Sequence, residues 1–268
     1  MESGKSQEVT WITGGGSGIG RALAIEMAHR GQIVVVSGRR QNRLDEVVTL
    51  LKKQGYEALA IPCDVSQPEA TKVAAKEIVR RFGRLDTCVA NAGFSVKGAF
   101  ETLSPKEWRR QMDVNLFGVI WTLQAALPYI KSTKGRLVVI SSVAGKFATP
   151  KHSAYCSSKF ALVGLCDTLY MELKTQGVSV SNILPGLVES EIAWVGNDGQ
   201  FKPTPSKRPN YLVWPAKRAA KSIAKAIFKR KRQAIITGHG KLAVFLARYL
   251  PGLTYWLMSQ NLKKLQES

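Results

Sequence analysis

The sequence predicts an α/β fold, in which a doubly wound, parallel sheet of seven strands forms a single domain with an appended C-terminal helical element. Short apolar runs rich in β-branched residues alternate with longer segments of helical period. One such run, residues 33–36, is continuously β-branched, as expected of a strand buried on both faces. Parallel strands need crossover connections, which the intervening helical segments supply. The 268 residues, 45% of them hydrophobic, suffice for one sizeable core.

The predicted elements follow one another in strict alternation. The strands are expected at residues 9–13, 33–36, 58–62, 87–90, 136–141, 178–184 and 233–237. The helices are expected at residues 21–29, 44–54, 67–82, 106–131 (one long helix or two abutting ones), 154–176 and 216–229. Residues 189–215 hold four prolines and little periodicity, which predicts a long loop or lid. We expect a dinucleotide-binding and catalytic domain at residues 1–240 and an apolar, basic extension at residues 241–268.

A glycine-rich segment, residues 13–20, joins the first predicted strand to the first helix. Such a turn lets the backbone approach a pyrophosphate closely, and the helix N-terminus offers N–H groups and a positive dipole to the anion. The alternative is an ordinary tight turn. Because the required strand precedes the glycines and the required helix follows them, we interpret the segment as the nucleotide turn of a Rossmann-type fold.

The end of the second strand bears on the choice of nicotinamide cofactor. An acidic residue there would bind the adenosine ribose 2′-hydroxyl and repel a 2′-phosphate. The sequence instead has Ser37, Gly38, Arg39 and Arg40, and two arginines can clamp a phosphate. Alternatively, both arginines are solvated charges at a helix start. Positive charge near a helix N-terminus is unfavourable, which a bound anion would relieve, so we predict NADP(H).

Tyr155 and Lys159 lie four residues apart in a predicted helix and therefore share a face. A phenol has a pKa near 10, but a lysine ammonium and a cationic nicotinamide both favour the phenolate. Lowering that pKa by about three units requires roughly 4 kcal/mol. Such a phenol can give a proton to a ketone oxygen or take one from an alcohol. Ser142, just past a predicted strand end, can hold the substrate oxygen beside it.

Taken together, these residues resemble the short-chain dehydrogenase/reductase family over residues 9–237. The resemblance rests on the glycine turn, Asp64-Val65, Asn91-Ala92-Gly93, Asn115, Ser142, Tyr155 with Lys159, and Pro185-Gly186, in the family's order and spacing. The chain departs from the pattern at Ser17, where a basic residue is missing from the glycine motif. The 2′-phosphate would then depend on Arg39, Arg40 and Ser17.

The resemblance implies a role for each site residue. Tyr155 would be the acid/base, Lys159 would bind the nicotinamide ribose and lower the tyrosine pKa, and Ser142 would orient the carbonyl. Asn115 would hold a water that links Lys159 to solvent, although a buried amide satisfied by backbone is the alternative. The implied cofactor contacts are Gly14, Ser17, Gly18, Ile19, Gly20, Arg39, Arg40, Asp64, Val65, Asn91, Ala92, Gly93, Tyr155, Lys159, Pro185, Gly186, Val188 and Ser190.

The predicted activity is NADPH-dependent interconversion of a ketone and a secondary alcohol. One rival is a non-catalytic NADP-binding sensor or scaffold on the same fold. Another is enoyl reduction, which the serine, tyrosine and lysine set fits less well. The family tendency implies a homodimer or homotetramer built through the helices at residues 106–131 and 154–176.

The C-terminal extension carries an unusual charge and hydropathy pattern. Residues 201–268 hold fifteen Lys or Arg and one acidic residue, which is +14 of the formal +20. Two apolar stretches, residues 242–250 and 253–258, are each shorter than the ~20 residues that a spanning helix needs. They predict two short helices in a bilayer interface, or alternatively a helix packed on the sheet or on a second subunit. A membrane-bound enzyme could take a steroid, a long-chain 3-keto lipid or a sphingoid ketone through the lid.

Other functional classes are disfavoured by the sequence. Nucleic-acid binding is not expected, because no recognition fold accompanies the charge. Cys63, Cys88, Cys156 and Cys166 form no zinc-type spacing and are interpreted as reduced, mostly buried thiols, and no metal site is expected. The polar N-terminus lacks the apolar core of a signal peptide. We therefore expect a cytoplasmic protein, peripheral on the cytosolic face of a membrane if the extension binds lipid.

Overall fold

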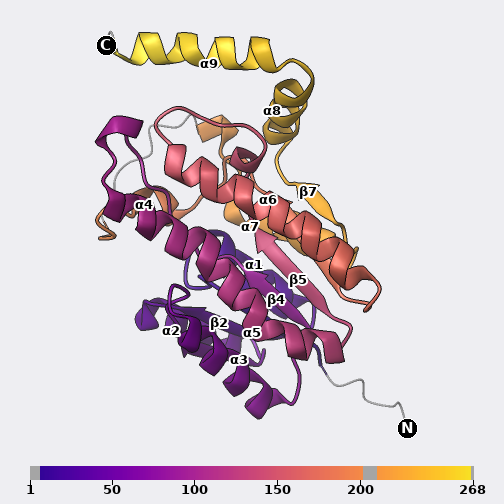
Figure 1. Ribbon diagram of the computed structural model, residues 1–268. Helices are drawn as coiled ribbons and strands as arrows, with labels where there is room; N and C mark the ends of the chain where they lie inside the picture. Colours follow the sequence, from indigo (N-terminus) through magenta and orange to yellow (C-terminus); the bar gives the residue numbers. More distant parts are fainter. Residues whose placement is uncertain (1–6, 202–209, 267–268) are drawn as a thin grey trace.

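The computed structural model describes residues 7–201 and 210–266, which form a seven-stranded parallel sheet covered by helices on both faces (Figure 1). The strand order is β3-β2-β1-β4-β5-β6-β7, and every neighbouring pair is parallel. This result confirms the predicted fold class. The strands are β1 (Val9–Thr13), β2 (Ile33–Gly38), β3 (Ala58–Pro62), β4 (Thr87–Ala90), β5 (Arg136–Ile140), β6 (Ser179–Leu184) and β7 (Gln233–Ile235).

The helices form two layers, one on each face of the sheet. They are α1 (Gly18–His29), α2 (Gln41–Lys53), α3 (Pro68–Phe82), α4 (Pro105–Met112), α5 (Gly118–Ser132), α6 (Ser153–Lys174) and α7 (Ala216–Phe228). Buried side chains of α1, α2 and α7 pack on one face, and those of α3, α5 and α6 pack on the other. Successive residues of one strand therefore point to opposite faces of the sheet. Trp11 packs against the layer of α3, α5 and α6, and Ile12 packs against the layer of α1, α2 and α7.

The predicted helical segment at residues 106–131 is resolved into α4, a π-helical turn (Asp113–Phe117) and α5. A capping box fixes the start of α4, because Ser104 Oγ accepts from the Glu107 N–H (3.3 Å) and Glu107 Oε2 accepts from the Ser104 N–H (2.8 Å). The helical path is continuous through the π turn, where a one-residue insertion widens the helix. Asn115, one of the predicted site residues, lies in this turn.

The lid and the C-terminal extension, which the sequence predicts to lie outside the alternating strands and helices, have the following structures. The described part of the predicted lid contains the 3₁₀ turns η4 (Glu191–Trp194) and η5 (Asn210–Leu212), and residues 202–209 lie outside the described residues. The extension forms two helices, α8 (Gly238–Tyr249) and α9 (Pro251–Gln266), which project from one end of the molecule (Figure 1). Across the described residues, no helix combines the length and hydropathy needed to cross a bilayer. All four cysteines are unpaired and buried, as predicted.

Candidate active site

A cavity of about 930 Å³ opens at the carboxyl ends of the central strands, where the strand order reverses between β1 and β4. Every predicted site residue except Asn115 lines this cavity. The glycine turn and the β2, β3 and β4 ends form one half, which we call the nucleotide half. Residues from the β5 end, α6 and the β6 end form the other, which we call the chemical half.

The glycine turn of the nucleotide half is packed against the β4 end with no room for side chains. Gly14 (φ +64°) and Gly18 (φ +50°) adopt the left-handed backbone conformation that favours glycine. A Cβ at Gly20 would collide with the Gly14 carbonyl oxygen. Asn91 Nδ2 donates to the carbonyls of Thr13 (2.8 Å) and Gly14 (3.2 Å), so its side chain holds the turn in place.

The N-terminus of α1 offers a set of donors suited to a pyrophosphate. Its N-cap residue, Ser17, makes no side-chain hydrogen bond to the helix, and the first turn carries no acidic residue. The backbone N–H groups of this turn and the helix dipole therefore remain to stabilise an anion in the cavity. With the tight glycine turn, this donor set fits the phosphates of a dinucleotide.

Beside Arg40 at the β2 end, the nucleotide half contains an acidic residue, Glu191, that was not predicted from the sequence. Arg40 Nη2 donates to Ser17 Oγ (3.2 Å) and to Glu191 Oε2 (2.6 Å). Glu191 comes from the lid, so the arginine at the start of α2 already has an anionic partner. Nearby, Asp64 Oδ1 accepts from the N–H (3.0 Å) and hydroxyl (2.8 Å) of Ser66, which fixes the orientation of its carboxylate.

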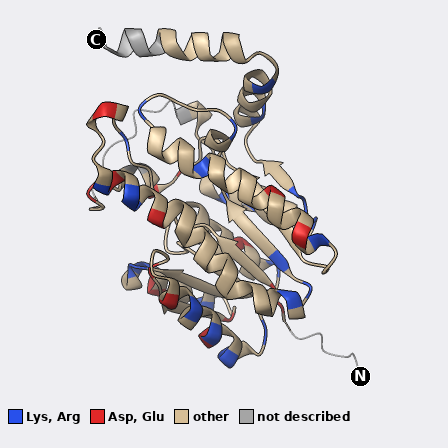
Figure 2. Cartoon of the chain, in the orientation of Figure 1, with Lys and Arg blue, Asp and Glu red and all other residues tan. Residues whose placement is uncertain are grey.

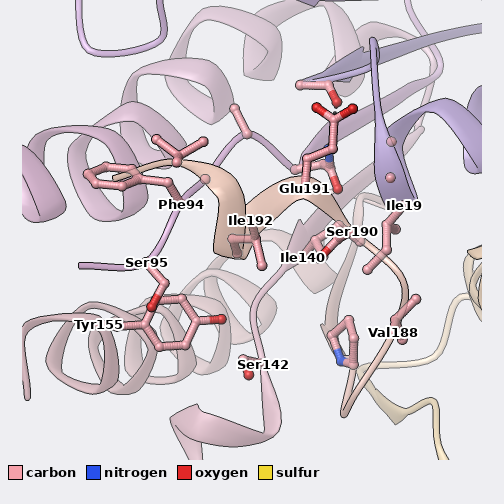
Figure 3. A pocket seen from close by; sticks show the side chains of 18 of the residues that line it. Ile19, Phe94, Ser95, Ile140, Ser142, Tyr155, Val188, Ser190, Glu191 and Ile192 are labelled. Carbon is pink, nitrogen blue, oxygen red and sulfur yellow. Dashed lines mark hydrogen bonds between the residues drawn. The ribbon is translucent and has the colours of Figure 1, made fainter. Parts of the chain in front are cut away.

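In the chemical half, the hydroxyls of Tyr155 and Ser142 point into the same part of the cavity (Figure 3). Ser142 caps a 3₁₀ turn after β5, where its Oγ accepts from the Ala144 N–H (3.1 Å). That bond uses an acceptor position and leaves the hydroxyl proton available for donation. Tyr155 projects from the first turn of α6. Ile192 of the lid lies across the cavity from both groups, and the carboxylate of Glu191 points away from them.

Lys159 lies one helical turn beyond Tyr155 and is buried, with only 4% of its surface exposed. Its Nζ donates to the Ile140 carbonyl oxygen (3.1 Å) and lies 5.7 Å from the centroid of the Tyr155 ring. Burial lowers the pKa of Lys159 from 10.5 to about 8. At pH 7 the side chain therefore remains mostly an ammonium, and this positive charge favours the Tyr155 phenolate.

Asn115 is buried and does not line the cavity. Its Nδ2 donates to the Phe94 carbonyl (2.9 Å), and its Oδ1 accepts from the Phe94 N–H (3.1 Å). The side chain is thus satisfied by backbone, which corresponds to the alternative raised from the sequence. A part in proton relay stays a prediction for this residue.

The wall of the chemical half includes His239, Gly240 and Ala243 of α8, which the sequence did not predict as site residues. The backbone N–H of Leu187 donates to His239 Nε2 (3.0 Å). Since a backbone N–H only donates, Nε2 must be unprotonated. Burial lowers the pKa of His239, which favours this neutral form. The bond joins the extension to the Pro185–Val188 loop, and the apolar character of α8 gave no indication of it.

The lid is attached to the rest of the molecule at its far end. Arg110 of α4 donates to the carbonyls of Gly196 (3.3 Å) and Asn197 (2.8 Å), and its guanidinium lies 4.3 Å from the Phe94 ring centroid. Asn197 also exchanges two hydrogen bonds with the backbone of Lys97 (2.9 and 2.8 Å). Ile192, Val195 and Phe201 of the lid line the cavity.

Comparison with known proteins places the chain among oxidoreductases. The family described as short chain dehydrogenase matches residues 8–200. An 11-beta-hydroxysteroid dehydrogenase 1A of Arabidopsis thaliana is 31% identical over 258 residues, covering 93% of this chain and 74% of that protein. A dehydrogenase/reductase SDR family member 7B of Xenopus laevis is 32% identical over 266 residues, covering 96% and 82%.

Solved structures share the fold over most of its length. An alcohol dehydrogenase from the archaeon Thermococcus sibiricus, complexed with 5-hydroxy-NADP, has a TM-score of 0.76 at 28% identity and covers 86% of this chain and 96% of its own. A short chain dehydrogenase/reductase from Burkholderia phymatum, in complex with NAD, has a TM-score of 0.82 at 25% identity and covers 92% and 95%. Proteins similar to this chain therefore bind either nicotinamide dinucleotide.

Proposed function

Since this chain belongs to the short chain dehydrogenase family, we propose that it interconverts a ketone and a secondary alcohol, with NADP(H) as its preferred cofactor. The observation that carries this proposal is the convergence of Tyr155 and Ser142 on one part of the cavity, with the Lys159 ammonium buried behind the tyrosine. A non-catalytic NADP sensor could use the lysine to bind the cofactor, but it would not need the Tyr155 and Ser142 hydroxyls to converge.

The chemistry follows from the three side chains. When bound, the nicotinamide cofactor supplies or accepts the hydride. In the direction of reduction, Ser142 donates a hydrogen bond to the ketone oxygen and orients it beside Tyr155. The Tyr155 hydroxyl then gives its proton to that oxygen, and the Lys159 ammonium stabilises the phenolate that remains. In the direction of oxidation, the same phenolate takes the proton from the alcohol.

The preference for NADP(H) is supported by charge. Arg39, Arg40 and Ser17 line the nucleotide half and can donate to a 2′-phosphate, and no acid follows Gly38 at the end of β2. Dissociation constants measured by calorimetry should be lower for NADPH than for NADH. Equal constants, or tighter binding of NADH, would refute the preference.

A lipophilic substrate is supported by the walls of the chemical half and by the relatives. The apolar side chains that line the cavity include Phe94, Val143, Phe147, Leu187, Ile192 and Val195. Four relatives carry the name 11-beta-hydroxysteroid dehydrogenase. We therefore propose a steroid, a long-chain 3-keto lipid or a sphingoid ketone as the substrate class.

The activity is tested by following NADPH oxidation with a panel of such ketones. Tyr155→Phe should lower kcat/KM about 10²- to 10⁴-fold while leaving the NADPH dissociation constant nearly unchanged. Tyr170→Phe removes a hydroxyl from the same helix outside the cavity and should retain activity. A wild-type protein that binds NADPH but reduces no ketone in the panel would favour the non-catalytic alternative.

We also propose that α8 and α9 rest on an anionic lipid surface. Eight of their large apolar side chains are between 45% and 62% exposed, namely Leu242, Phe245, Tyr249, Leu250, Leu253, Tyr255, Trp256 and Leu257. Among the described side chains, α8 carries the basic residues Lys241 and Arg248, and neither α8 nor the described part of α9 carries an acidic one (Figure 2). Aromatic side chains at headgroup depth and cations beside anionic lipid are typical of an interfacial anchor.

Vesicle sedimentation tests this anchor. Wild-type protein should sediment with vesicles of mixed phosphatidylcholine and phosphatidylserine, and salt should weaken the binding. Trp256→Glu combined with Leu253→Glu should abolish it, whereas Val73→Glu, an exposed apolar position on α3, should not. Point substitutions are preferable to truncation, because α8 also lines the cavity. Unchanged sedimentation of the double variant would rule the anchor out.

Self-association through α5 and α6 is proposed on similar grounds. Phe117, Phe160 and Met171, on and beside these helices, are exposed apolar side chains. Sedimentation equilibrium should give a dimer or tetramer, and Phe160→Glu with Met171→Glu should shift it to the monomer.

A further inference from the structure

The contact between Arg40 and Glu191 joins two parts of the nucleotide half that are 151 residues apart in the sequence. Arg40 immediately precedes α2, and Glu191 opens η4 of the lid. Their side chains approach to 2.6 Å, and Glu191 has only 19% of its side chain exposed. Arg43 of α2 adds a second cation, 3.9 Å from the other carboxylate oxygen. Arg40 itself is 41% exposed, so the pair is partly screened by solvent, and its short distance and the second cation are what distinguish it from an ordinary surface pair.

The same guanidinium makes the other contacts that define this corner of the cavity. Arg40 Nη2 donates to Ser17 Oγ (3.2 Å) in the glycine turn, and its guanidinium carbon lies 5.0 Å from the ring centroid of Phe201 in the lid. Arg40 therefore connects the glycine turn, α2 and the lid. Under the function proposed above, it is also one of the donors that would hold the 2′-phosphate of the cofactor.

The Glu191 carboxylate and a 2′-phosphate would both bind Arg40, and they would repel each other. A phosphate monoester carries about −1.5 to −2 charges at pH 7, so it attracts Arg40 more strongly than a carboxylate does and repels Glu191. A ribose 2′-hydroxyl, by contrast, can donate to a carboxylate, which is how an acid at the end of the second strand selects NAD(H) in related folds. Here the carboxylate comes from the lid instead of the strand end.

We propose that Glu191 is a cofactor-selectivity residue, which competes with the 2′-phosphate for Arg40 and so limits the preference for NADP(H). This inference rests on the proposed function, because it requires a cofactor bound in the nucleotide half. When the 2′-phosphate takes Arg40, Glu191 loses its 2.6 Å partner and keeps only the longer contact with Arg43, so the η4 end of the lid is held less tightly. The far end of the lid stays attached through Arg110 and Asn197.

Binding of two adenosine fragments that differ only in the 2′-phosphate tests the competition directly. The dissociation constants of 2′,5′-ADP and 5′-AMP are measured by calorimetry for the wild type and for Glu191→Gln, which keeps the shape and removes the charge. The variant should bind 2′,5′-ADP roughly 3- to 10-fold more tightly, with 5′-AMP unchanged or weaker. The ratio of the NADH and NADPH dissociation constants should shift in the same direction.

Glu189→Gln is the matched control. Glu189 lies two residues before Glu191 in the lid, and its Oε2 accepts from the Ala216 N–H at the start of α7 (3.2 Å). This variant removes the same charge from the same segment and should leave the fragment ratio unchanged. If both variants shift the ratio equally, the effect is one of overall charge, and the proposed competition is wrong.

Two further measurements separate the possible failures. If Arg40→Ala weakens 2′,5′-ADP binding but Glu191→Gln has no effect, the selectivity role fails and the proposed cofactor preference stands. If Arg40→Ala has no effect on 2′,5′-ADP binding, the competition for Arg40 is wrong, and the cofactor preference is then decided by the NADPH and NADH dissociation constants. Hydrogen exchange at the amides of residues 190–195 should quicken when 2′,5′-ADP binds and not when 5′-AMP binds. If the affinity shifts but hydrogen exchange at residues 190–195 stays the same, the phosphate does not displace Glu191 from Arg40.

Discussion

Replacing Lys159 by methionine should separate the catalytic value of the buried ammonium from its cost to the fold. Burial lowers the pKa of Lys159 from 10.5 to about 8. Because one pKa unit corresponds to 1.36 kcal/mol, the charged form is disfavoured in the folded protein by about 3 kcal/mol. Methionine has a similar length and no charge, so it removes that cost.

The substitution also removes the hydrogen bond from Nζ to the Ile140 carbonyl. Leaving a buried carbonyl without this donor costs about 1–3 kcal/mol. The two contributions nearly offset one another, and Lys159→Met should be between unchanged and about 2 kcal/mol more stable than the wild type at pH 7. Its kcat/KM should nevertheless fall about 10²- to 10⁴-fold, because the phenolate loses its stabilising cation.

The pH dependence of stability gives a sharper test. The folded state binds the Lys159 proton less tightly than the unfolded state, so unfolding takes up a proton between about pH 8 and 10.5. The contribution of Lys159 to stability therefore rises with pH through this window and is lost as the pH falls through 8. Between pH 7 and 9.5, the wild type should gain about 2 kcal/mol relative to Lys159→Met.

Urea unfolding, followed by circular dichroism at both pH values, measures this difference. Lys174→Met serves as the control, because Lys174 is an exposed lysine on the same helix. Its stability relative to the wild type should not change with pH. Parallel stabilities of wild type and Lys159→Met between pH 7 and 9.5 would refute the assignment of a depressed lysine pKa.

Substitutions at Gly20, His239 and Arg110 should have separable effects. Gly20→Ala should weaken NADPH binding at least tenfold, measured by calorimetry, and should destabilise the fold, because the added Cβ meets a carbonyl of the glycine turn. The control is Gly164→Ala in an open part of α6, which should stabilise the fold by about 0.5–1 kcal/mol in urea unfolding. His239→Leu should raise KM for the ketone and His239→Gln should largely restore it, since glutamine can accept from the Leu187 N–H; equal defects in both variants would contradict this role. Arg110→Ala should speed hydrogen exchange at residues 196–199 and leave α2 unchanged.

Much of the fold could be predicted because its signals are local. A continuous run such as residues 33–36 identifies a buried strand without any knowledge of its neighbours, and the glycine turn predicts the conformation that Gly14 and Gly18 adopt. Tyr155 and Lys159 share a face because the helical repeat brings them together. The sequence therefore placed these residues at one site before any distance was known.

The features that the sequence missed depend on tertiary contacts. Glu191 lies in an aperiodic segment, and nothing local shows that it meets an arginine 151 residues earlier. His239 was given no role from the sequence, although it lines the cavity and accepts a hydrogen bond from Leu187. For Asn115 the sequence left open a water-holding role and an amide satisfied by backbone, and the hydrogen bonds with the Phe94 backbone come from a tertiary contact.

The two-sided character of α8 has a consequence for how substrate selectivity can diverge. Ala243 faces the cavity, whereas Leu242, Phe245 and Tyr249 of the same helix face outward. The helix follows the last strand, so it can be exchanged between homologous enzymes without disturbing the sheet or the reacting side chains. A chimera carrying a foreign α8 would therefore inherit part of the donor's choice of ketone, together with the donor's surface chemistry.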